Sequence, residues 1–216
     1  MSAPRYHALI SVGDNLAIDG PDLGPGRGAA SLFYKNRDSE WPEFRGRDLV
    51  TRDPSVRPFM LAQDKATIGT TLTNQLKRIQ PYDEPVLVIV TVGGLDFLGA
   101  SGSKPPPNIA KDADALYEGV TAIFEELGRR LSDWTAFATN IPAVASTKKA
   151  QTLLQEFNDC MAEVAHEQSA SLIDICGHFE DHGPKSEEPW IQDGLALTPI
   201  GANELRRLFW NALTAL

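Results

Sequence analysis

Short apolar runs alternate with longer stretches of helical periodicity along this chain. The strongest run, Pro85 to Val92, is continuous and is therefore typical of a strand covered on both faces of a parallel sheet. Four further runs predict strands, and the second of them is the weakest: Ala8 to Val12, Pro58 to Ala62, Trp134 to Ile141 and Ala170 to Cys176.

Three stretches repeat apolar residues at spacings of three and four, which predicts one buried face on each of three helices. The first face runs from Leu116 to Leu131 and the second from Leu153 to Val164. The third helix begins at Thr198-Pro199, a capping residue followed by a first-turn proline, and carries Leu205, Leu208, Phe209 and Leu213.

Strands that alternate with helices predict an α/β fold, here a three-layer α/β/α sandwich around a mostly five-stranded, doubly wound parallel sheet. Residues 1–216 show no internal repeat or linker, so we expect a single domain. Ligands bind such sheets beyond the carboxyl ends of the strands. Three irregular stretches follow predicted strand ends, and they are either plain surface loops or the roof of a pocket: Gly20 to Gly28, Gly99 to Pro107 and Gly183 to Asp193.

Composition narrows the function classes. Of the 216 residues 42% are hydrophobic, and the formal net charge is −9, which argues against nucleic acid or an anionic membrane as a partner. Neither Cys160 nor Cys176 belongs to a metal-binding or redox pair. Without a signal peptide or membrane span in the sequence, we expect a cytoplasmic location. Three small basic pairs are expected on solvated faces: Arg45 and Arg47, Lys148 and Lys149, Arg206 and Arg207.

Four short blocks follow predicted strand ends. They are Gly13-Asp14-Asn15, Leu61 to Leu72, Val90 to Leu98, and Asp193 to Gly201. In this order they resemble the blocks of the SGNH (GDSL-type) hydrolase superfamily, which read Gly-Asp-Ser, Asp-Gly-Ala-Thr, Gly-x-Asn-Asp and Asp-Gly-Leu-His-x-x-x-x-Gly. The resemblance covers nearly the whole chain and implies the same α/β/α fold.

The resemblance also implies a chemistry. In that superfamily a serine attacks a carbonyl, and a histidine oriented by the aspartate three residues before it takes the serine proton. The serine amide, the amide of the block-two glycine and the block-three asparagine side chain hold the oxyanion.

This chain departs from the pattern at each of those positions. Asn15 replaces the serine, Lys65 the glycine, Leu95 the asparagine and Ala196 the histidine. Losing a triad nucleophile or base lowers the rate by about 10⁶-fold, so the standard serine mechanism is predicted to be absent. The frame is kept at Gly13, Asp14, Gly93, Asp96, Asp193 and Gly201.

We therefore expect a pocket that binds a small molecule or a protein partner, with no cofactor and no metal. Asn15, Leu95, Ala196 and Asp193 should surround it at the carboxyl edge of the sheet. The binding residues that we expect there are Asp14, Asn15, Lys65, Gly93, Gly94, Asp96, His182 and Asp193.

Two other functions stay open. One is an ester or acyl hydrolase with a relocated mechanism, in which His182 pairs with Asp193 or in which Asp14, Asp64, Asp96 and Asp193 hold a metal or share a proton. Substitute nucleophiles near strand ends would be Ser101, Ser103, Thr67 and Cys176. The other function is a structural homo-oligomer.

One further segment, Trp41 to Val50, is predicted to form a short helix that begins at Pro42. Arg45, Arg47 and Asp48 would then share that helix, and either arginine could clamp an anionic group or form a surface ion pair.

Overall fold

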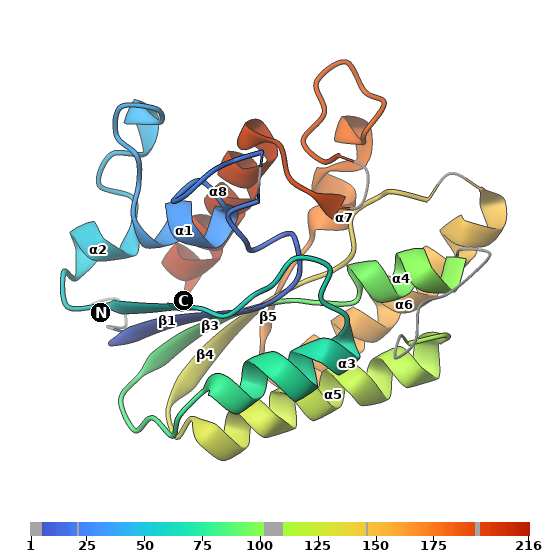
Figure 1. Ribbon diagram of the computed structural model, residues 1–216, viewed down its shortest axis with the longest axis horizontal. Coiled ribbons are helices and arrows are strands. Elements are labelled where there is room, and N and C mark those ends of the chain that lie inside the picture. Colours follow the sequence, from blue (N-terminus) through green and yellow to red (C-terminus); the bar gives the residue numbers. More distant parts are fainter. Residues whose placement is uncertain (1–5, 21, 102–109, 146, 193–194) are drawn as a thin grey trace.

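Five parallel strands form one sheet in the order β2-β1-β3-β4-β5 (Figure 1). The computed structural model describes the chain except residues 1–5, 21, 102–109, 146 and 193–194. The strands are β1 (Ala8–Gly13), β2 (Arg57–Met60), β3 (Val86–Thr91), β4 (Trp134–Thr139) and β5 (Ser171–Ile173). Helices cover both faces of this sheet, so the predicted three-layer α/β/α architecture is confirmed.

One helical layer contains α1 (Ala29–Tyr34), α2 (Leu49–Arg52), α7 (Ile175–His178) and α8 (Pro199–Ala215). The opposite layer contains α3 (Ile68–Thr70), continued by η2 (Thr71–Gln75) and η3 (Leu76–Arg78), then α4 (Gly94–Ser101), α5 (Ala113–Arg130) and α6 (Lys148–Glu167). Two short 3-10 turns, η1 (Pro42–Phe44) and η4 (Glu180–His182), lie in loops.

The central strand β3 explains why its sequence is apolar throughout. All six of its residues are buried. Val86, Val88 and Val90 pack into the core beneath α5 and α6, whereas Leu87 and Ile89 point into the core beneath α1 and α8. Since both faces of the strand are covered, the sequence does not alternate between apolar and polar residues.

The last strand is shorter than predicted. β5 stops at Ile173 because the Asp174 side chain accepts a hydrogen bond from the Gly177 amide (3.1 Å) and caps α7. Cys176 therefore lies in a helical turn, not at the end of a strand. The loop predicted at Gly99 to Pro107 is wrong in its first part, since α4 continues to Ser101, and its remainder lies outside the described residues.

Two predictions about basic residues are wrong. Arg206 is fully buried, because its guanidinium lies 3.6 Å from the Phe44 ring centre and donates to Asn36 (2.8 Å). Arg45, Arg47 and Asp48 do not share a helix either, since η1 ends at Phe44 and Asp48 caps α2 through the Thr51 amide.

Candidate functional site at the carboxyl edge of the sheet

The turn after β1 is held by a close backbone approach to Thr91 and by the Gln75 side chain. Gly13 has a φ of 120°, and a Cβ there would lie 1.7 Å from the Thr91 carbonyl oxygen, so only glycine fits. The fully buried Gln75 side chain accepts from the Gly13 amide (2.7 Å) and donates to its carbonyl (2.8 Å). This clamp fixes the direction in which the next two residues leave the strand.

Asn15 joins the first block to the second. Its side chain is 8% exposed, and its Oδ1 accepts a hydrogen bond from the Lys65 backbone amide at 2.7 Å. The Lys65 backbone is left-handed (φ 56°), which turns that amide toward Asn15, while the lysine side chain is 79% exposed with its Nζ 4.0 Å from Asp64. The amide is thus the part of Lys65 that belongs to the site.

Asp14 is fully buried beneath this contact. Its Oδ1 accepts from the Leu16 amide (3.1 Å), whereas Oδ2 has no hydrogen-bond partner among the described residues. Burial raises the pKa of Asp14 from its ordinary value of 3.8 to about 7, and the hydrogen bonds oppose that shift only in part. Asp14 has no exposed surface in this structure, and its predicted part in ligand binding stays a prediction.

Gly93 and Gly94 carry the chain from β3 into α4. Asp96, on the first turn of α4, accepts hydrogen bonds from the Ile68 amide (3.0 Å) and the Ala110 amide (2.8 Å), so it ties the start of α3 to the segment before α5. Burial raises the pKa of Asp96 as well. Leu95 is half-buried and packs against the apolar core beneath α1 and α8. Its hydrocarbon side chain has no hydrogen-bond donor.

The fourth block approaches the third through Leu195. A Cβ on Gly94 would lie 2.4 Å from the Leu195 Cδ1, so the two segments are in close contact, and Leu195 itself has a left-handed φ of 67°. Ala196 is half-buried, and its carbonyl accepts from the Gln192 amide (2.7 Å). Asp193 lies outside the described residues, so its predicted place beside Ala196 stays a prediction.

The structure gives the substitute base His182 other contacts. Its ring stacks on Trp190 at a centroid distance of 3.5 Å and an interplanar angle of 1°, and its Nδ1 lies 3.0 Å from the Glu188 carbonyl oxygen. The pairing of His182 with Asp193 is untested, because Asp193 is not described. Within the described ranges no group of three or more His, Cys, Asp or Glu residues is arranged to hold a metal, and Asp64 is exposed.

The substitute nucleophiles also have ordinary roles where they are described. Thr67 accepts from the Thr70 amide and caps α3, and Ser101 donates to the Leu98 carbonyl. Burial, followed by the nearby Asp174 carboxylate, raises the pKa of Cys176, which keeps it a thiol. Ser103 lies outside the described residues.

Three residues that shape this edge were not among the predicted site residues: Gln75, Thr91 and Leu195. Gln75 sits in a polar stretch that reads as surface helix, and its burial follows only from its contact with a turn 62 residues earlier. The Thr91 carbonyl accepts a hydrogen bond from the Asp14 amide (2.8 Å). The signal that could have found Leu195 is its place inside the fourth block.

Solved structures show which fold this is. An acetyl xylan esterase, AlAXEase, superposes with a TM-score of 0.67 at 15% sequence identity, covering 95% of this chain and 98% of its own. A lipolytic G-D-S-L family protein from Veillonella parvula gives a TM-score of 0.69 at 14% identity, covering 97% and 99%. The chain has an SGNH hydrolase-like fold.

Axe2, an acetylxylan esterase from Geobacillus stearothermophilus, also shares this SGNH hydrolase-like fold, with a TM-score of 0.70, 13% identity and coverage of 99% of this chain and 96% of its own. Comparisons of the sequence with protein-family models and with curated proteins give no match. Among the described residues, no helix has both the length and the apolar character needed to cross a membrane.

Proposed function

We propose that this chain is an SGNH-fold protein without serine esterase activity, which binds a small molecule or a protein partner at the carboxyl edge of β1 and β3. The observation that carries the proposal is the 2.7 Å hydrogen bond from the Lys65 amide to the Asn15 Oδ1. In the superfamily that this chain resembles, the corresponding amide serves the oxyanion. Here the Asn15 side-chain oxygen occupies the position in which that amide would hold the oxyanion.

Three replacements support the loss of chemistry. A carboxamide at Asn15 has no hydroxyl to activate, and a methyl group at Ala196 accepts no proton. Leu95 adds apolar surface where a donor would be needed, and removal of one such donor lowers the rate by about 10²- to 10³-fold. Asp14 does not compensate, since its carboxyl is buried, and the His182 ring is stacked on Trp190.

The binding half of the proposal rests on what these replacements keep. Gln75, Asp14 and Asp96 still hold the loops of this edge in fixed positions through buried hydrogen bonds. An edge that keeps these hydrogen bonds but has lost its nucleophile and base can hold a ligand without attacking it.

Esterase activity is tested on p-nitrophenyl acetate. We expect the purified chain to hydrolyse it no faster than a matched amount of heat-denatured protein. Turnover well above that level, abolished by one substitution at the carboxyl edge, would overturn the proposal and identify the true nucleophile.

Binding is tested by a fragment screen with ligand-observed NMR on the wild type and two variants. Ala196→Trp adds a large side chain at a half-buried position of this edge, whereas Ala215→Trp places the same side chain at the exposed end of α8. We expect a set of fragments to lose their signal with the first variant and keep it with the second. If every fragment treats the two variants alike, this edge is not the binding site.

A further inference from the structure

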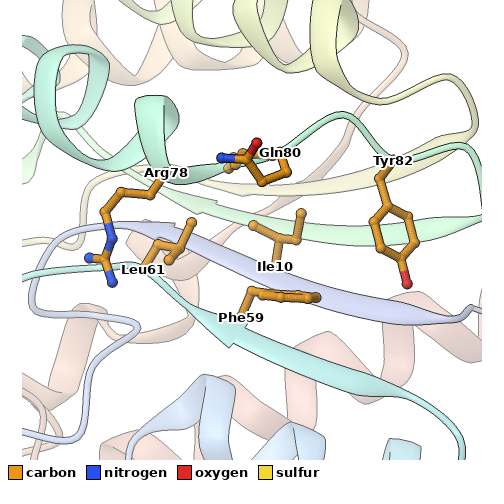
Figure 2. Close-up of a pocket in the computed structure, with 7 residues that line it drawn as sticks. Ile10, Phe59, Leu61, Arg78, Gln80 and Tyr82 are labelled. Atoms are coloured by element: carbon orange, nitrogen blue, oxygen red, sulfur yellow. The ribbon is translucent and has the colours of Figure 1, made fainter.

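A cavity of about 70 Å³ lies at the open side of β2, away from the residues discussed above (Figure 2). Ile10, Phe59 and Leu61 form its apolar wall, and Gln80 lies opposite them. Arg78 and Tyr82 lie at its two ends, as Figure 2 shows. The cavity is thus mostly apolar, with a polar group at each end.

The strand pairing explains why this apolar surface is left open. Phe59 pairs with Ile10 in the parallel register of β2 and β1, yet Phe59 is 39% exposed and Ile10 only 3%. β2 is the edge strand, and the helical cover on this face ends with η3 at Arg78. The chain then runs on to Tyr82, whose ring meets the Phe59 ring edge-on at a centroid distance of 6.4 Å.

Arg78 lines the cavity, and two further arginines that contact its lining residues form ion pairs. Arg57 pairs with Glu84 (3.5 Å), and Arg130 pairs with Glu126 (2.6 Å) while donating to the Ile79 carbonyl. Arg78 forms no ion pair within the described part of the chain, and its side chain is exposed. The net charge of the chain is −9, so this guanidinium is a local site of positive charge. Beside an apolar cavity it favours the binding of an anion.

Tyr82 adds a donor at the other end. Its hydroxyl oxygen accepts a hydrogen bond from Arg57, and the Arg57 guanidinium lies 5.5 Å from the Tyr82 ring centre. Because the Arg57 guanidinium is a donor with no acceptor atom, the Tyr82 O–H stays available to donate to an acceptor on a ligand.

We propose that this cavity binds a small monocarboxylate with a compact apolar body, an aromatic ring or a branched alkyl group. The body packs on Phe59 and Ile10, and the carboxylate pairs with Arg78, whose planar fork suits two parallel hydrogen bonds. An added peptide strand fits this edge poorly, because Pro58 in the middle of β2 has no N–H to donate. The site is independent of the proposed function at Asn15, which shares none of these lining residues.

The test is an NMR titration of the full chain with benzoate, followed through backbone amide shifts. We expect a dissociation constant of about 1 mM, as befits a ligand of about nine heavy atoms, with the largest shifts at residues 59–61 and 78–82. Benzamide has the same ring without the charge and should bind about fivefold to tenfold more weakly.

Variants separate this site from general charge effects. Arg78→Gln should weaken benzoate binding about tenfold, while Lys77→Gln, which removes a neighbouring exposed charge outside the cavity, should leave it unchanged. Phe59→Ser should abolish binding, and a spectrum that keeps its native dispersion shows that this variant is folded. Absence of benzoate shifts at 59–61 and 78–82, equal binding of benzamide, or equal effects of Arg78→Gln and Lys77→Gln would each overturn the proposal.

Discussion

Replacing Asp14 with asparagine should make the stability of this protein less sensitive to pH. In the folded chain the Asp14 pKa is raised to about 7 by burial, while the unfolded chain has its ordinary value of 3.8. Between these two values the folded state binds more protons than the unfolded state. Stability from this group is therefore fully present below pH 3.8 and is lost as the pH rises through about 7.

The size of the effect follows from the shift. One pKa unit corresponds to about 1.4 kcal/mol, so ionising Asp14 in the folded state costs about 4 kcal/mol at high pH, as an upper bound. Between pH 5 and pH 8 the wild type should lose about 2.5 kcal/mol relative to Asp14→Asn. The asparagine keeps an oxygen for the Leu16 amide, so the fold has no reason to change.

The assay is urea denaturation of both proteins at several pH values from 5 to 8, with the difference in free energy of unfolding plotted against pH. Asp64→Asn serves as a control, since that carboxyl is exposed. As the pH rises, we expect the free energy of unfolding of the wild type to fall relative to that of Asp14→Asn. Relative to Asp64→Asn it should stay constant. A constant gap for Asp14→Asn would refute the argument that burial governs this carboxyl.

Three further predictions test the site and the core. Asn15→Ser with Ala196→His should restore weak hydrolysis of p-nitrophenyl acetate, and adding Leu95→Asn should raise kcat/KM by more than about tenfold; background rates in both folded variants would mean that this edge is no relic of serine chemistry. Gln75→Leu should lower the free energy of unfolding by about 1–3 kcal/mol in urea denaturation, because it leaves a buried backbone N–H unpaired; an unchanged value would contradict the clamp. Arg206→Met should lower it by about 1–3 kcal/mol by the same method, because the buried Asn36 and Asn203 side-chain oxygens lose the guanidinium as their donor; an unchanged value would show that these contacts add no net stability.

Local patterns were enough for the architecture. The apolar run at Pro85 to Val92 identified the central strand, and the three- and four-residue spacing of apolar positions identified α5, α6 and α8. These patterns work because a residue's neighbours in sequence share its strand or helix, so the covered faces repeat with the period of the element. The absence of a serine at position 15 and of a histidine at position 196 is likewise a property of the sequence alone.

Tertiary structure decided the features that depend on partners far apart in the chain. Arg206 is buried because Asn36 and Phe44 meet it from more than 150 residues away, a contact that no local charge pattern shows. The Lys65 amide is occupied by Asn15, 50 residues earlier, and the pKa of Asp14 is raised by the core that closes over it. Burial and hydrogen-bond geometry are properties of the packed chain, so the state of these groups became visible only once the sheet and its helices were assembled.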